Sequence, residues 1–109
     1  MRKYALALDL KDDDELIRQY EEYHKQVWPE ILESIKNSGI QNMEIYRTDN
    51  RLFMIMEVGD DFSFDVKAEA DAGNPKVQEW EKLMWDYQQA LPKSKPGEKW
   101  VLMDKIFSL

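Results

Sequence analysis

The sequence has no cysteine, a single histidine and only four glycines among its 109 residues. The lack of cysteine excludes disulfides, a thiolate nucleophile and a cysteine-ligated zinc site. The glycines do not form a phosphate-binding loop or a dinucleotide-binding fingerprint, and one histidine cannot make a paired-histidine zinc motif. No serine lies in a sharp glycine-flanked turn of the kind that serine hydrolases use. We therefore expect neither a metal nor a cofactor.

Positive charge is also scarce, because 15 basic residues stand against 22 acidic ones and the net charge is −7. An acidic chain is repelled by polyanions and by anionic lipid surfaces, so we expect no nucleic acid and no membrane as partner. No apolar run is long enough for a transmembrane span or a signal peptide. Acidic residues follow soon after the start of the sequence, at Asp9 and at positions 12–14. These features predict a cytoplasmic location.

The length matches one domain over residues 1–109, and the 43% hydrophobic content is enough for one core. A domain of this size buries a modest share of its surface and is marginally stable alone. Association of two copies is a common remedy, so a homodimer is expected.

Hydrophobic periodicity predicts the elements in the first third of the chain. Alternating apolar residues indicate a strand over residues 3–10. Asp12 or Asp13 then caps a helix, which breaks before Pro29, restarts there and stops at Gly39. The inward-facing residues expected of these two helical segments are Leu16, Tyr20, Tyr23, Val27, Ile31, Leu32 and Ile35.

The rest of the chain reads as a hairpin, two helices and a last strand. Strand-like runs at 43–46 and 52–58 flank a short polar loop, and the second run is apolar enough to predict cover on both faces. Residues 61–71 carry Phe62, Val66 and Ala70 at helical spacing, with the acids 60–61 expected at the helix start. Residues 100–107 form the predicted final strand. The stripe of the intervening helix comprises Val77, Trp80, Met84, Tyr87 and Leu91.

This order of elements is that of a ferredoxin-like sandwich, an α+β fold in which helices cover one face of an antiparallel sheet. The other sheet face is apolar and needs cover. Two copies packed sheet to sheet would supply that cover and form a dimeric α+β barrel.

The single histidine, His24, is the natural candidate for chemistry near neutral pH. Tyr20 precedes it by four residues and Trp28 follows by four, so the three rings share one helix face. Rings beside an imidazole suit a sugar, which offers apolar C–H faces and hydroxyl groups. Amphipathic helices also bury tyrosine and tryptophan for packing alone, and a lone histidine among them is then a packed side chain.

Several spaced motifs resemble the L-rhamnose mutarotase family, and the resemblance runs over nearly the whole chain. It implies a dimeric ferredoxin-like domain that needs no cofactor and interconverts the α and β anomers of a 6-deoxy sugar. The motifs are Tyr20-x-x-x-His24-x-x-x-Trp28-Pro29-Glu30, Gly39-x-x-Asn42, Ile45-Tyr46 and Gln78-x-Trp80-x-Lys82-x-Met84.

Within those motifs the resemblance assigns roles residue by residue. The family's proposed proton donor falls on His24, its helix tyrosine on Tyr20 and its first indole on Trp80. Met43 and Glu81 stand where rhamnose enzymes have a tyrosine and a second tryptophan. The segments 83–85 and 97–100 look more like L-fucose mutarotases, so L-fucose is the expected substrate.

The expected site thus has His24 as catalytic residue and Tyr20, Tyr46, Trp80, Glu81 and Met43 as substrate-binding residues. Imidazole, with a pKa of about 6.5, can give or take a proton near neutrality. The general base is left open among Tyr20, Tyr46, Glu81 and a water molecule. Two other functions also fit the sequence: a small-ligand-binding module, and a cofactor-independent oxygenase of the same small barrel architecture.

Overall fold

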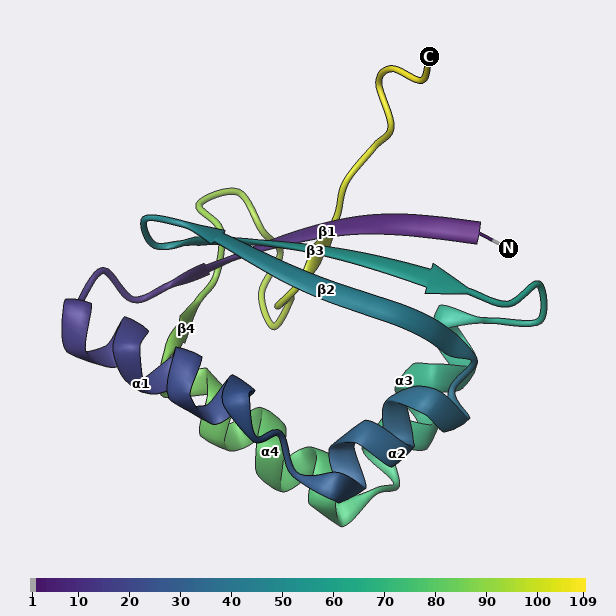
Figure 1. Ribbon diagram of the computed structural model, residues 1–109, viewed down its shortest axis with the longest axis horizontal. Coiled ribbons are helices and arrows are strands. Elements are labelled where there is room, and N and C mark those ends of the chain that lie inside the picture. The colour runs from purple at the N-terminus through teal and green to yellow at the C-terminus, as the bar shows by residue number, and fades with distance from the viewer. Residues whose placement is uncertain (1) are drawn as a thin grey trace.

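The computed structural model describes residues 2–109 and shows an antiparallel sheet with its helices on one side (Figure 1). This confirms the predicted α+β class and the layer order. The elements are β1 (Arg2–Leu10), α1 (Asp14–Lys25), α2 (Pro29–Asn37), β2 (Ile40–Thr48), β3 (Arg51–Val58), α3 (Phe64–Ala72), α4 (Pro75–Trp85), β4 (Gln88–Gln89) and β5 (Val101–Leu102).

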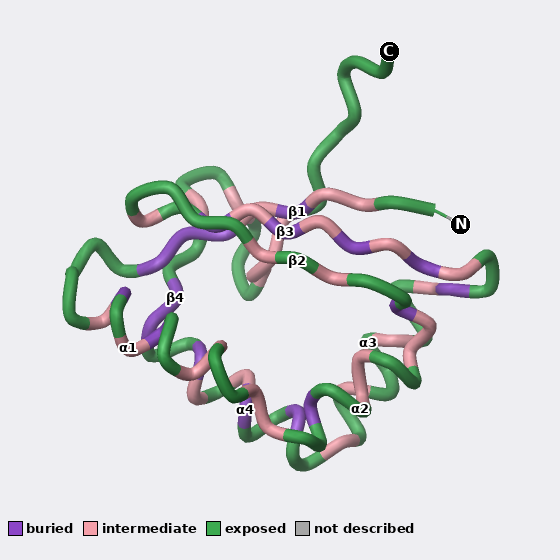
Figure 2. Tube along the Cα trace, in the orientation of Figure 1, coloured by how far each residue is buried: buried purple, intermediate pink, exposed green. Residues whose placement is uncertain are grey.

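The strands lie in the order β2-β3-β1-β4, and β5 pairs with a different stretch of β1. Leu6 pairs with Met54 and Leu8 with Leu52, so these side chains point to the same face. That face meets the helices and is buried, as the alternation of colours along β3 shows (Figure 2). Within one chain the helices cover only one face of β3, and Phe53 stays half-exposed on the other. Cover on both faces therefore stays a prediction that depends on a second copy.

Local signals in the sequence fix the first two helices. The carboxylate of Asp13 accepts a hydrogen bond from the Leu16 N–H at 3.0 Å and caps α1, as expected for one of the two candidate acids. Pro29 opens α2 after a break, since proline is compatible with the first turn of a helix only. Gly39 follows α2 with a φ of +94°, a conformation that favours glycine and lets the chain turn into β2.

The helix expected over residues 61–71 begins later, at Phe64. Ser63 caps it by accepting from the Val66 N–H at 3.3 Å, so the acids at 60–61 lie in the preceding turn and do not start the helix. Phe62 is buried before the helix starts, and every residue of α3 is at least partly exposed. Leu32 of α2, expected to face inward, is also exposed.

Two expectations for the C-terminal third are wrong in extent. Helix α4 ends at Trp85, because the chain then turns so that Gln88 pairs with Leu10 at the edge of the sheet. Tyr87 and Leu91, which were expected on the helix, lie beyond its end, and Tyr87 is buried there. The final strand is confined to Val101–Leu102. Tertiary pairing with β1 overrides the helical periodicity in the first case.

Past β5 the chain leaves the sheet and runs away from the rest of the molecule (Figure 1). Its side chains include apolar ones in water, with Ile106 95% and Phe107 76% exposed. Within residues 2–109 the helices are too short or too polar to cross a membrane.

The buried core divides into two clusters, one under α1 and α4 and one toward the hairpin and Phe62. Tyr20, Trp80 and Met84 belong to the first, and Leu6, Met54 and Met56 to the second. Members of both clusters line the cavity that forms the candidate site.

Candidate active site

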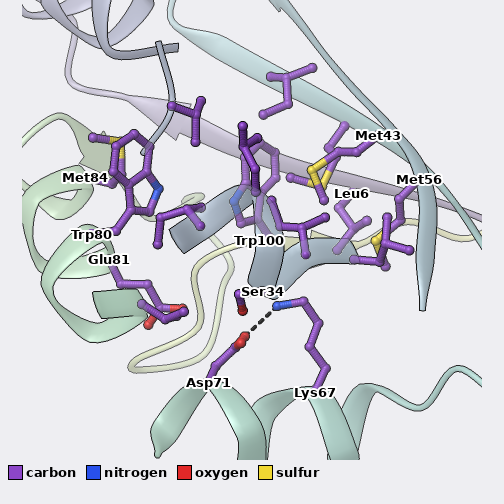
Figure 3. Close-up of a pocket in the computed structure, with 18 of the residues that line it drawn as sticks. Leu6, Ser34, Met43, Met56, Lys67, Asp71, Trp80, Glu81, Met84 and Trp100 are labelled. Atoms are coloured by element: carbon purple, nitrogen blue, oxygen red, sulfur yellow. Dashed lines mark hydrogen bonds and ion pairs between the residues drawn. The ribbon is translucent and has the colours of Figure 1, made fainter. Parts of the chain in front are cut away.

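A cavity of about 780 Å³ lies between the helices and the inner face of the sheet (Figure 3). Its volume is in the range of about 300 to 1,000 Å³ that small-molecule sites occupy. Apolar lining residues come from both the strands and the helices, and polar lining residues come from helices, from strands and from the segment before β5. The lining includes Leu6, Tyr20, His24, Met43, Ile45, Met54, Met56, Lys67, Asp71, Trp80, Glu81, Met84, Gln88, Lys99 and Trp100.

His24, near the C-terminal end of α1, has its tautomer fixed by the helix backbone. Its Nδ1 lies 2.8 Å from the carbonyl oxygen of Tyr20. A carbonyl only accepts, so Nδ1 carries the proton and Nε2 holds a free lone pair in the neutral ring. Burial lowers the pKa of His24 below its ordinary value of 6.5, and the hydrogen bond to Tyr20 only partly opposes this. At neutral pH His24 is therefore a neutral side chain with a basic nitrogen.

Tyr20 lies one helical turn before His24, and the centroids of the two rings are 4.3 Å apart. Only 3% of Tyr20 is exposed. Its hydroxyl oxygen accepts a hydrogen bond from the Gln88 side-chain amide at 3.3 Å. Burial raises the pKa of Tyr20 to about 12, with the bond from Gln88 acting weakly against it. Tyr20 thus keeps its proton at neutral pH, which suits a proton donor better than a base.

Trp80 of α4 is buried and lines the cavity, as expected. Its ring centroid is 5.8 Å from that of His24 at an interplanar angle of 65°. Trp28 does not line the cavity and packs against Trp80 with ring centroids 5.0 Å apart at 71°, in an edge-on contact. Trp28 therefore supports a residue of the cavity wall and does not itself contact the cavity.

Met43 and Glu81 also line the cavity, from β2 and α4 respectively (Figure 3). Tyr46 does not lie with them. On β2 Met43 and Ile45 point inward, so Tyr46 points to the other face, where it is 52% exposed and its hydroxyl bonds to Glu44 at 3.2 Å. The expectation that Tyr46 lines the same pocket as His24 is wrong, because neighbouring strand residues face opposite ways.

Three cavity residues were missed or read differently in the sequence. Gln88 was not predicted as a cavity residue, because the helix was expected to continue to Leu91. Lys99 was noted only as part of the segment 97–100 that looks like L-fucose mutarotases, with no role given to it. Its Nζ donates to the Glu81 carbonyl at 3.1 Å. Burial lowers the pKa of Lys99, while the Glu81 carboxylate opposes the shift. Trp100 reads as a sheet-packing residue by strand pattern, and only the fold shows that it reaches the cavity.

The cavity continues past Glu81 toward α3, where the ammonium group of Lys67 pairs with the Asp71 carboxylate at 2.5 Å (Figure 3). Among residues 2–109 the structure shows no group of three histidine or carboxylate side chains that could hold a metal ion.

Comparison with known proteins decides the family. A family profile for L-rhamnose mutarotase matches residues 3–109. The chain belongs to the L-rhamnose mutarotase family. Members of this mutarotase family are carbohydrate isomerases, so the chain is assigned to that class of enzyme.

Two curated relatives and one solved structure illustrate the similarity. An L-fucose mutarotase of Xanthomonas campestris pv. campestris is 49% identical, over 100% of this chain and 89% of the relative. An L-rhamnose mutarotase of Phocaeicola vulgatus is 30% identical, over 88% of each. The crystal structure of an L-rhamnose mutarotase from Formosa agariphila superposes with a TM-score of 0.73 at 24% identity, covering 100% of this chain and 99% of that one. The last comparison supports the fold of this mutarotase family member.

We expect His24 to titrate with a midpoint below 6.5 and to carry its proton on Nδ1 when neutral, because the ring is buried and bonded to Tyr20. A depressed pKa means that the unfolded chain binds the proton more tightly. The stability that His24 contributes is then present above pH 6.5 and is lost as the pH falls through the folded-state pKa.

Nitrogen-15 NMR of the single histidine as a function of pH reports both the tautomer and the midpoint. A midpoint at or above 6.5, or a neutral ring protonated on Nε2, would contradict the assignment.

Proposed function

We propose that this protein is a mutarotase of 6-deoxyhexoses that opens and closes the pyranose ring with Tyr20 and His24. The observation that carries the proposal is the pairing of a neutral imidazole, protonated on Nδ1, with a phenol whose pKa is raised to about 12. One group is a base and the other an acid at the same pH. Ring opening requires one of each.

In the opening step His24 Nε2 takes the proton of the anomeric hydroxyl while the Tyr20 hydroxyl gives its proton to the ring oxygen. The bond between the anomeric carbon and the ring oxygen breaks, and an aldehyde forms. After rotation about the adjacent carbon–carbon bond, the open-chain hydroxyl attacks either face of the aldehyde. It returns its proton to Tyr20, and the His24 imidazolium protonates the new anomeric oxygen. His24 is thus the base on opening and the proton donor on closure.

The aromatic and charged surroundings support this sequence of steps. The imidazolium and phenolate arise together, with ring centroids 4.3 Å apart, so each offsets the charge of the other in a buried site. Trp80 presents a ring beside His24 on which the apolar face of a sugar can lie. A pure binding module or an oxygenase would not exchange anomers, which makes that exchange the discriminating measurement.

His24→Asn should lower the rate of anomer exchange by roughly 10² to 10⁴-fold, because the amide can replace Nδ1–H but not the Nε2 base. Tyr20→Phe should lose a comparable factor, since it keeps the ring and removes the acid. NMR saturation transfer between the anomeric protons of L-fucose measures the rate at matched concentrations of folded protein.

The matched control is Tyr46→Phe, which removes a hydroxyl on the outer sheet face and should keep the parent rate. Unchanged exchange in His24→Asn would remove His24 from the mechanism.

We further propose that L-fucose is preferred over L-rhamnose. The L-fucose mutarotase relative is 49% identical and the L-rhamnose mutarotase relative 30%. Glu81 and Met43 both line the cavity, so the site has a carboxylate and lacks the aromatic groups expected of the rhamnose branch. The two sugars differ in the orientation of ring hydroxyls, and a carboxylate discriminates between such epimers when one of them leaves it unpaired.

Exchange with L-fucose should therefore be faster than with L-rhamnose, and Glu81→Gln should narrow the difference. Glu79→Gln, on the exposed side of α4, is the control and should leave the ratio unchanged. If L-rhamnose exchanges at least as fast as L-fucose, the substrate preference is wrong while the mutarotase proposal stands.

We also propose that two copies associate through the outer sheet face and the segment after β5. The outer sheet face exposes Tyr46, and the segment after β5 exposes Ile106 and Phe107. Exposed apolar side chains of this kind favour association with a second copy. Sedimentation at micromolar concentration should give a dimer, and Phe107→Glu should shift it toward the monomer. A monomeric parent protein would contradict this arrangement.

A further inference from the structure

Gln88 is a polar side chain in the core, with only 6% of its surface exposed. It lies on the short strand β4, opposite Leu10 of β1, and contributes to the wall of the cavity. Its neighbour Gln89 is exposed. A buried amide is costly unless its polar atoms are paired, so the position of Gln88 calls for a physical explanation.

Only one end of this amide is paired. Nε2 donates to the Tyr20 hydroxyl oxygen at 3.3 Å, across 68 positions of sequence. Oε1 is buried and has no hydrogen-bond partner among residues 2–109. Gln88 lines the cavity, so the unpaired end of its amide is a buried acceptor beside a space that can hold a ligand.

The bond to Tyr20 also determines what the pair offers to a ligand. Because Gln88 is the donor in this hydrogen bond, the proton of the Tyr20 hydroxyl is not used to bond Gln88 and can be donated to a ligand. The two side chains together present one unpaired acceptor, Oε1, and keep the Tyr20 hydroxyl proton and the second Nε2 proton as donors. A sugar carries the complementary groups in its hydroxyls and its ring oxygen.

We infer that Gln88 is a specificity-determining residue whose Oε1 accepts a hydrogen bond from one non-anomeric hydroxyl of the bound sugar. In the same pose its Nε2 holds Tyr20 so that the phenolic proton is available to the ring oxygen. The anomeric hydroxyl is excluded as the donor to Oε1 because its proton goes to His24. This inference rests on the proposed mutarotase function and adds a selection rule: the substrate must bear a hydroxyl at one defined ring carbon.

The test compares anomer exchange of L-fucose with that of its 2-, 3- and 4-deoxy derivatives, in the parent protein and in Gln88→Met. Methionine has a similar length and no acceptor oxygen. For one derivative the parent should lose about tenfold in kcat/KM, the equivalent of one lost hydrogen bond. Gln88→Met should be slower with L-fucose and should no longer distinguish it from that same derivative. Gln89→Met is the matched control and should keep the parent ranking.

A second variant separates selectivity from folding and from the chemical step. Gln88→Glu keeps an acceptor oxygen but cannot donate to Tyr20, so kcat should fall while the hydroxyl selectivity remains. The side-chain amide signals of Gln88 should also shift on addition of L-fucose and not on addition of the critical deoxy sugar.

The inference is overturned if Gln88→Met keeps the parent ranking of all four sugars, or if Gln88→Glu loses it. If the parent protein does not accelerate anomer exchange of L-fucose or of L-rhamnose, both the mutarotase proposal and this inference are overturned. Exchange by the parent with an unaltered ranking in Gln88→Met overturns the inference alone, so the two failures are distinguishable.

Discussion

The sheet is covered by helices on one face only, and this constraint determines which side chains reach the cavity. A strand turns successive residues to opposite faces, so each strand can send only alternate positions toward α1 and α4. Met43 and Met54 point into the site for this reason, while Tyr46 and Phe53 pack together on the far side with ring centroids 6.3 Å apart. The apolar wall behind the acid and base groups is thus a direct result of the way the sheet is layered.

A second feature is the helix α1, which brings together the side chains that we propose as acid and base. Tyr20 and His24 are four residues apart, and the backbone carbonyl of the first fixes the tautomer of the second at 2.8 Å. Burial shifts the two pKa values in opposite directions on the pH scale, downward for His24 and upward for Tyr20, so both groups are neutral in the resting site. An uncharged pair needs no counter-ion and is suited to an uncharged sugar.

Most helix and strand boundaries could be predicted from the sequence, because helix caps, proline breaks and glycine turns depend on residues that are neighbours along the chain. The cap at Asp13, the break at Pro29 and the turn at Gly39 were readable from single residues and were confirmed. The family motif likewise placed His24 and Trp80, both of which line the cavity. Gln88 could not be found in the same way, because its position depends on pairing between β4 and β1, a contact across the chain that no periodicity records.

The break between α1 and α2 has a consequence for the kind of ligand motion that the site can accommodate. Because the chain changes direction at Trp28 and Pro29, the cavity is bounded by two helical segments and extends from His24 to the ion pair of Lys67 and Asp71. A closed pyranose is compact, whereas the open-chain aldehyde between the two anomers is longer. In the mechanism that we propose, the additional length of the cavity provides space for that extended intermediate to rotate without leaving the protein.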